Sequence, residues 1–185
     1  AGWKAGMTHI LARDLNLRSL SAGQEVRVPV TVVECPKMRI LGVRGYSMNA
    51  YGKQAAGEAW VDASQISEAF PDLFKRLPVR KEHDSEKHFE NLDKADLVEV
   101  RLIVATQPAA VSSLSSKTPD LMEIGLDGGT IGEKLAYAKG KLGEEYSFAD
   151  AFDEGGLTDI VAVTKGYGWQ GVIKRFGGKL QSHKN

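Results

Sequence analysis

Cysteine is nearly absent from this sequence, since Cys35 is the only one among its 185 residues. One cysteine cannot form an internal disulfide, which excludes a disulfide-stapled domain and favours a reducing compartment. Because it stands beside Pro36 in an apolar run, we expect Cys35 to be a small buried residue. No apolar run approaches the roughly 20 residues that span a bilayer, and the first residues lack a secretion leader. We therefore expect neither a membrane partner nor secretion.

Acidic residues are absent after Asp159, although the whole chain is neutral, with 24 basic and 24 acidic residues. Residues 1–57 carry eight Lys/Arg against three Asp/Glu, and residues 58–159 carry eleven against twenty-one. Residues 160–185 carry five against none, so the net charges of the three segments are +5, −10 and +5. Charge segregated in this way favours a basic surface that faces a polyanion. The alternative is that the basic end is a solvated terminus.

A catalytic or metal-binding set of residues is also absent from the sequence. His83 and His88 are five positions apart, which places them on different faces of a helix, and no cysteine or third histidine stands near them. A zinc site needs such further ligands, so we expect both to be exposed polar residues. His9 stands in a predicted strand without an obvious nucleophile. The sequence predicts no enzyme, no catalytic residue, no metal, no cofactor and no small-molecule substrate.

One glycine motif keeps an enzymatic alternative open. Gly166, Gly168 and Gly171 follow a β-branched run in the G-x-G-x-x-G pattern of dinucleotide-binding loops. That loop needs a helix that starts at its glycines and an acidic residue about 20 positions later. Here residues 177–178 are both glycine and end any helix within two turns, and no acid follows. We expect no helix N-terminus for phosphate, and a nucleotide-binding enzyme fragment that uses the Gly166–Gly171 loop remains the alternative function.

Hydrophobic periodicity predicts a mainly β chain. Short alternating or β-branched runs, separated by Gly and Pro, are typical of a barrel or sandwich. Pro29 within one run predicts a sheet edge or a bulge. The expected strands are 7–13, 25–34, 38–43, 59–61, 97–106, 120–126 and 158–164.

The expected helices lie in the acidic middle of the chain. Residues 62–77 read as a helix interrupted at Pro71, and residues 82–92 as a short exposed helix. A capping box from Thr130 to Glu133 opens a helix that runs to about residue 142. Residues 147–150 can cap a short turn, and residues 108–119 read as a loop.

Glycine, aromatic and basic residues interleave at the end of the chain. The rings of Tyr167, Trp169 and Phe176 can stack on bases, and the basic side chains between Lys165 and Lys179 can neutralise phosphates. Glycines let the backbone approach another chain closely. The combination is typical of an arm that threads into folded RNA. The alternative is that Trp169 and Phe176 cap a barrel core.

Four stretches of the chain resemble one protein family. They are KAGMTHI (4–10), VPVTVVECP (28–36), VEVRLIV (98–104) and DIVAVTKGYGWQGVIKRFG (159–177). In order and spacing they resemble the archaeal and eukaryotic branch of the L-three family of large-ribosomal-subunit proteins. The chain departs from the family at Phe176, where many members have Trp, and at Tyr167, where a basic residue or His is common. The resemblance extends over essentially the whole chain, and the chain covers roughly half of an archaeal member of the family.

The resemblance also implies a fold, a six-stranded translation-protein-type β-barrel that is incomplete in this chain. It carries an inserted α/β helical region and an extended basic arm. Residues 1–61 would form the first half of the barrel and residues 62–95 a helical acidic insertion turned away from RNA. Residues 96–165 would add barrel strands and a further helical insertion at about 130–152, and residues 166–185 the RNA-binding arm.

The function implied is that of a structural constituent of the large ribosomal subunit in the cytoplasm. It would bind large-subunit ribosomal RNA beside neighbouring large-subunit ribosomal proteins, and support assembly and the peptidyl-transferase region. The residues we expect to contact or approach RNA are Lys4, Arg44, Lys165, Gly166, Tyr167, Gly168, Trp169, Gly171, Lys174, Arg175, Phe176, Lys179, His183 and Lys184.

Overall fold

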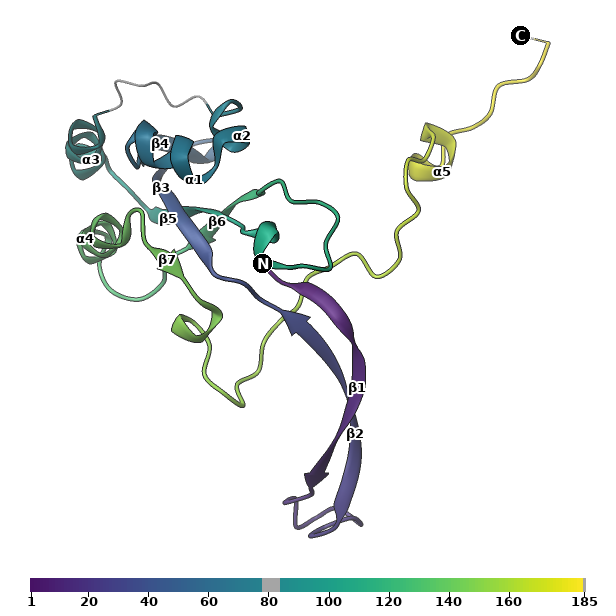
Figure 1. Ribbon diagram of the computed structural model, residues 1–185. Helices are drawn as coiled ribbons and strands as arrows, with labels where there is room; N and C mark the ends of the chain where they lie inside the picture. Colours follow the sequence, from purple (N-terminus) through teal and green to yellow (C-terminus); the bar gives the residue numbers. More distant parts are fainter. Residues whose placement is uncertain (78–83, 185) are drawn as a thin grey trace. The chain divides into compact units, whose positions relative to one another are not determined.

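Two antiparallel sheets organise the first of the chain's two units, Ala1–Phe152, and the second unit is Asp153–Asn185 (Figure 1). The structure is a computed structural model and describes residues 1–77 and 84–184. Strands outweigh helices in the first unit, so the prediction of a mainly β chain is confirmed. Among the described residues, no helix is long and apolar enough to cross a bilayer.

The smaller sheet is a two-stranded ribbon of β1 (Trp3–Arg13) and β2 (Glu25–Glu34). The predicted strand 25–34 is confirmed, and the predicted strand 7–13 begins four residues earlier. Pro29 lies opposite His9, and β2 pairs with β1 alone among the described strands, so Pro29 occupies a strand with a free edge as predicted. Asp14 closes the connecting loop, because its carboxylate accepts hydrogen bonds from the Asn16 N–H and the Ser21 hydroxyl.

The larger sheet has five strands, in the order β4-β3-β5-β6 with β7 paired to β3. These are β3 (Met38–Asn49), β4 (Gly52–Trp60), β5 (Glu99–Ala105), β6 (Leu121–Gly125) and β7 (Glu145–Tyr146). The predictions for β5 and β6 are confirmed to within two residues. The predictions for β3 and β4 were too short, and β7 was not predicted.

Strand glycines explain why β3 and β4 were cut short. Gly45 and Gly57 lie in the Gly- and Asn-containing region between the two predicted strands, but both belong to paired strands. A Cβ on Gly45 would lie 2.9 Å from a methyl carbon of Leu92, and one on Gly57 would lie 3.2 Å from the same carbon. A side chain at either position would press on Leu92, because this leucine from a helix packs directly on the sheet backbone.

The helices occur where the sequence predicts them. α1 (Ala63–Ala69) and α2 (Pro71–Phe74) meet at the predicted break, and α4 (Ile131–Lys141) begins with the predicted capping box. α3 (Ser85–Lys94) begins later than expected, and residues 82–83 lie outside the described chain. Short 3-10 turns occupy Pro108–Ala110, within the predicted loop, and Phe148–Asp150, where the predicted cap is present.

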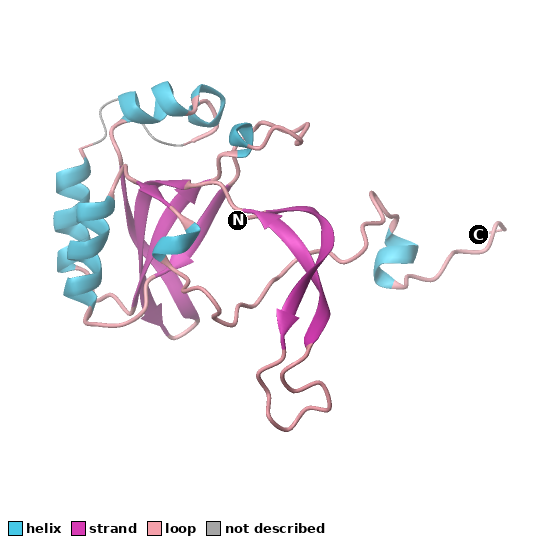
Figure 2. Cartoon of the chain, turned by 60° about the horizontal axis from the view of Figure 1, so that its bottom comes forward, coloured by secondary structure: helices cyan, strands magenta, loops and turns pink. Residues whose placement is uncertain are grey.

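Helices pack on both faces of the five-stranded sheet, which gives two core clusters (Figure 2). β5 serves both, because Leu102 and Val104 point into one cluster and Ile103 into the other. α3 and α4 cover the first face, and α1 and α2 cover the second. The helix predicted over 82–92 was expected to be exposed, and this was wrong for one side of α3, which is buried. Its polar residues face water, but Phe89 and Leu92 are 5% and 2% exposed.

Two further predictions about packing need correction. Cys35 is half-buried instead of buried, with its sulfur close to Gly2. The strand predicted over 158–164 is wrong, since those residues pair with no strand of the described chain. Ile160, Val161 and Val163 are 77%, 98% and 83% exposed. Their β-branched side chains favour a pleated, half-buried surface, but strand formation also requires a neighbour to pair with.

The described part of the chain contains no closed barrel, because β1 and β2 form one sheet and the other five strands form another. The six-stranded barrel therefore stays a prediction. The second unit has one regular element, the short helix α5 (Val172–Phe176), and every described residue in it is exposed.

Candidate nucleic-acid interface

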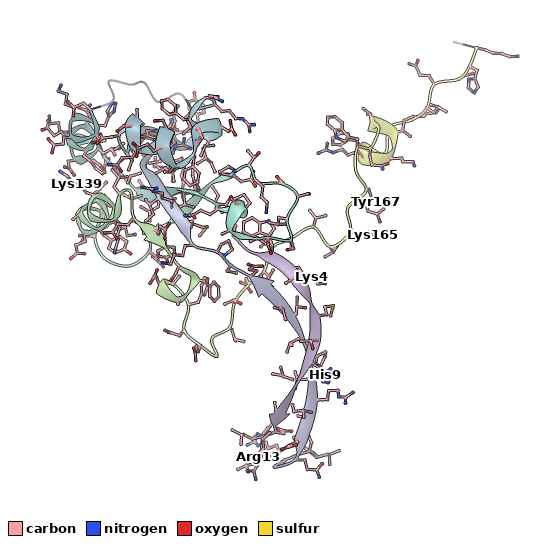
Figure 3. The ribbon with its side chains drawn as sticks, viewed as in Figure 1. Lys4, His9, Arg13, Lys139, Lys165 and Tyr167 are labelled. Carbon is pink, nitrogen blue, oxygen red and sulfur yellow. The ribbon has the colours of Figure 1, made fainter. Side chains whose placement is uncertain are left out.

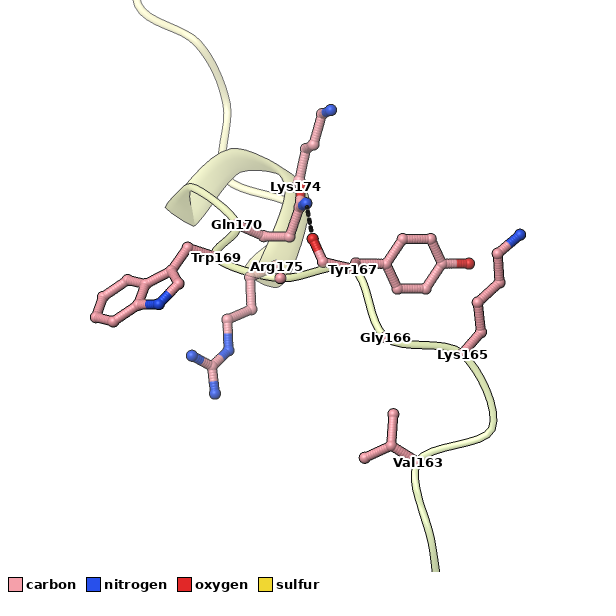
Figure 4. A pocket seen from close by; sticks show the side chains of 9 residues that line it. Val163, Lys165, Gly166, Tyr167, Trp169, Gln170, Lys174 and Arg175 are labelled. Atoms are coloured by element: carbon pink, nitrogen blue, oxygen red, sulfur yellow. Dashed lines mark hydrogen bonds between the residues drawn. The ribbon is translucent and has the colours of Figure 1, made fainter. Parts of the chain in front are cut away.

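The glycine motif of the second unit forms a tight turn (Figure 4). Gly168 has φ +64°, a left-handed conformation that glycine adopts without strain. The Gln170 side-chain amide donates a hydrogen bond of 2.7 Å to the Tyr167 carbonyl oxygen and closes the turn. Trp169 lies within this closed turn and is fully exposed, at 104% of its reference accessibility. The turn therefore holds an indole out in water.

A helix follows the turn directly, contrary to one expectation. Gly171 caps α5, and its carbonyl oxygen accepts from the N–H groups of Lys174 and Arg175 at 3.1 and 3.0 Å. The expectation that no helix begins at these glycines was wrong. The expectation that the helix would be short is confirmed, because Gly177 takes a left-handed conformation, with φ +64°, and ends α5 after five residues.

An open concavity of about 1000 Å³ collects most of the predicted RNA-contacting residues of the arm. It is lined by Val163, Lys165, Gly166, Tyr167, Gly168, Trp169, Gln170, Lys174 and Arg175. Three of these side chains carry a positive charge, and none carries a negative charge. The arrangement can hold an anionic chain at several points, which is the requirement for phosphate binding.

Two of the three aromatic rings in this segment are already covered by a cation. The Lys165 ammonium lies 5.8 Å from the centroid of the Tyr167 ring, and the Arg175 guanidinium lies 5.3 Å from that of Phe176. Such cation–π contacts hold the charged group near the ring at an exposed site. Among the residues that the structure describes, no cation lies over the Trp169 ring.

The other predicted arm residues lie next to this concavity in sequence. Gly171 and Phe176 are the cap and the last residue of α5. Lys179, His183 and Lys184 follow α5 and are exposed. Lys4 belongs to the first unit, on β1, where its side chain is exposed (Figure 3).

Arg44 lies in a different environment from the arm, within an ion-paired cluster on the five-stranded sheet. Its Nε and Nη2 donate to Glu58 at 2.9 and 2.5 Å, and its Nη1 pairs with Glu123. The side chains of all three are only partly exposed, between 22% and 30%. The Arg44 charge is therefore neutralised by its own sheet.

The same cluster continues across β5. Arg101 donates to Glu99 at 2.7 Å and to Glu123 at 3.3 Å, and Lys53 pairs with Glu99. Hydrogen bonds from Arg101 and then Lys53 lower the pKa of Glu99 to about 2. Burial pushes the pKa of Glu123 upward, but the Tyr46 hydroxyl, 2.8 Å away, and the nearby arginines lower it overall. These carboxylates stay charged at neutral pH, so three bases and three acids balance.

Candidate metal ligands do not gather in the described residues, where no group of three or more His, Cys, Asp or Glu side chains lies together. Of the two histidines considered as ligands, His88 is exposed on α3, as expected, and His83 lies outside the described residues.

Comparison with known proteins identifies the family. A family model described as "Ribosomal protein L3" matches residues 1–185. The chain belongs to this family. The resemblance seen in its sequence motifs is thereby confirmed.

Curated relatives carry the name "Large ribosomal subunit protein uL3". The chain is 40% identical to the one from Picrophilus torridus over 185 residues, which is all of this chain and 53% of the relative. It is 44% identical to that of Archaeoglobus fulgidus over 177 residues, 96% of this chain and 52% of the relative. The match to Methanococcoides burtonii is 38% over 191 residues, 100% of this chain and 55% of the relative. The chain thus spans about half the length of the curated relatives it matches.

Sequence reasoning missed two features of these sites. It did not assign a role to Gln170, whose side-chain amide bonds to the backbone of its own turn. It also missed the cluster around Arg44, although Glu99 and Arg101 at alternate positions mark one face of a strand. Their partners on neighbouring strands are determined by the register, which the sequence does not display.

Proposed function

We propose that this chain is part of a structural protein of the large ribosomal subunit, and that its second unit binds large-subunit ribosomal RNA. The observation that carries the proposal is the open concavity of the arm, which is lined by three basic residues, Lys165, Lys174 and Arg175. The family and the relatives' names support the ribosomal setting. In this proposal the protein is a cytoplasmic ribosomal component and not an enzyme.

The physical argument rests on what can hold the arm in place. Residues 160–185 contain five basic side chains and no acid, and the described ones bury no side chain. A segment of this kind gains too little from apolar burial to fix its own conformation. Phosphates supply the missing interaction, because each neutralised phosphate releases condensed counterions.

The first unit serves as the folded anchor. Its ion-paired cluster is neutral in sum, so we assign Arg44 a smaller share of RNA affinity than the arm. The acidic segment 62–95 turns away from RNA in this proposal, because like charges repel within a Debye length of about 8 to 10 Å. The free edges of β1 and β2 fit a ribbon that belongs to a larger translation-protein barrel in the complete protein, beside neighbouring ribosomal proteins.

A salt titration tests the proposal. The protein and a double variant, Lys174→Ala with Arg175→Ala, are bound to a large-subunit RNA fragment at several salt concentrations in a filter assay. Losing two phosphate contacts should flatten the slope of log affinity against log salt by about 1 to 2.

The matched control is Lys139→Ala with Lys141→Ala, which removes two basic residues from the last turn of α4 in the first unit. It should leave the slope unchanged. If the arm variant keeps the wild-type slope, the arm is not the RNA contact. Stoichiometric micromolar binding of a nicotinamide, flavin or nucleoside triphosphate in titration calorimetry would support the enzyme alternative instead.

A further inference from the structure

We propose that Trp169 is a stacking platform for one unpaired nucleobase, so that the arm prefers RNA with an extruded nucleotide over an uninterrupted duplex. The inference rests on the proposed function and specifies the RNA feature that the same site recognises. It depends on three observations: which rings are free, how the turn is built, and which charges surround it.

The free ring is that of Trp169. Lys165 already lies over Tyr167, and Arg175 over Phe176, at the distances given above. A base that stacks on the face covered by the cation must displace it, so each of these rings has one face fewer to offer. The exposed indole of Trp169 offers an aromatic face without that competition in the described chain.

The turn makes Trp169 unlike a structural tryptophan. Trp60 shows the structural case in the same chain, since it is 6% exposed and its indole N–H donates to Glu58 at 2.9 Å. Trp169 instead follows a left-handed glycine, and the Gln170 bond to the Tyr167 carbonyl fixes the backbone on either side of it. Holding a large apolar ring in water costs free energy, and a ligand that covers the ring recovers it.

The charges in the concavity favour a nucleic acid as that ligand. Lys174 and Arg175 line the same concavity as Trp169, and Lys165 lines it next to Tyr167 (Figure 4). A base on the indole therefore brings its own flanking phosphates within reach of basic side chains. In a continuous duplex the faces of each base are covered by neighbouring bases, so only an unpaired or extruded base can offer a face to Trp169.

The test uses three RNA duplexes that differ at one position: fully paired, with one unpaired adenosine, and with an abasic residue in place of that adenosine. The 185-residue chain should bind the unpaired adenosine about 5- to 150-fold more tightly than the abasic RNA, which is the range for base stacking on an aromatic side chain. Trp169→Ala should bind all three RNAs equally, and Trp169→Phe should keep part of the preference.

Phe176→Ala is the matched control, because it removes a ring whose face is occupied by Arg175. It should change binding to the three RNAs by the same factor. Fluorescence gives an independent readout: the unpaired adenosine should quench emission in the wild type more than the abasic RNA does. Trp169→Phe should lose that difference. Its emission comes from Trp3 and Trp60 alone and gives the background signal of these two residues.

The outcomes separate this inference from the proposed function. If Trp169→Ala keeps the preference for the unpaired adenosine, or if the wild type shows none, the stacking role is overturned. If binding to all three RNAs is also insensitive to loss of Lys174 and Arg175, the proposed RNA function of the arm fails as well.

Discussion

The first unit and the second unit treat their apolar side chains in opposite ways. In Ala1–Phe152, Val100, Leu102 and Val104 alternate along a central strand and are at most 5% exposed. In Asp153–Asn185, the run around Val161 has a similar β-branched composition, but every described residue is exposed. The difference shows that apolar content alone does not make a core. A strand or helix also needs a partner that covers it, and the first unit supplies one for each face of its large sheet.

The two units also differ in how their charged side chains are paired. On the five-stranded sheet, bases and acids pair with one another across neighbouring strands. In the second unit the basic side chains have no acid after Asp159 to pair with. The cluster on the sheet is therefore neutral in sum, whereas the end of the chain after Asp159 carries an unbalanced positive charge.

Hydrogen exchange should show the largest contrast between the units. Amides of β5, which is paired on both sides, should exchange at least about a thousandfold more slowly than those of residues 165–170, because core strands open only with a large part of the global unfolding free energy. Adding large-subunit RNA should slow exchange in the arm much more than in β5. If the arm amides exchanged as slowly as those of β5 in the free protein, the arm would be as stably folded as the first unit, and the contrast between the units would not hold. The measurement is residue-resolved exchange by NMR.

Leu92→Ala should destabilise the first unit by about 2 to 5 kcal/mol, the usual cost of truncating a buried leucine. Leu92 packs over the backbone of Gly45 and Gly57, so its truncation leaves a cavity against the sheet. Urea denaturation gives the free energy of unfolding. Leu157→Ala, at a residue 104% exposed in the second unit, is the control and should change it by less than about 0.5 kcal/mol. If Leu92→Ala and Leu157→Ala lowered the free energy of unfolding equally, the difference in packing between the two units would be contradicted.

Alanine at Gly166 or Gly171 should affect RNA binding without affecting folding. A Cβ at either position meets nothing within 4 Å, and neither has the left-handed φ of Gly168. Neither glycine is therefore required by packing or backbone conformation within this chain. If RNA approaches the backbone there, an added methyl should weaken binding by about 1 to 3 kcal/mol, as overpacking does in a core.

The control for that prediction is Gly132→Ala on α4, where a Cβ is also unobstructed. It should leave RNA affinity unchanged in the same filter assay. Unchanged affinity for both arm variants would mean that the glycines do not mark points of close approach.

Acid should weaken the first unit through Glu99. Its pKa is lowered from 4.5 to about 2 in the folded chain, so its contribution to stability is present above about pH 4.5 and is lost as the pH falls towards 2. Glu99→Gln should therefore make the free energy of unfolding less dependent on pH between about 5 and 2. Urea titrations across this range measure the slope. Glu154→Gln in the second unit is the control, and an unchanged slope for Glu99→Gln would show that the ion pair is not formed in solution.

The family, the basic end without acids and several local elements could be predicted from the sequence alone. β2 and α4 follow from short-range rules, alternation in one and a capping box in the other, which depend on residues within a few positions. Four stretches, in their order and spacing, predicted the family, and the motif from Asp159 to Gly177 was the most specific of them. Seven of the nine residues that line the concavity were also predicted from this segment, because they are close in sequence, whereas Val163 and Gln170 were not.

Features that depend on contacts between residues distant in sequence could not be predicted and became visible in the folded chain. Gly45 became a strand residue because Leu92, 47 positions later, packs on it. Arg44 became part of an ion pair because strand register places Glu58 and Glu123 beside it. Trp60 and Trp169 are the same residue type, yet one is buried and the other exposed. Burial depends on which surfaces the fold brings together, and that is a property of the whole packed chain.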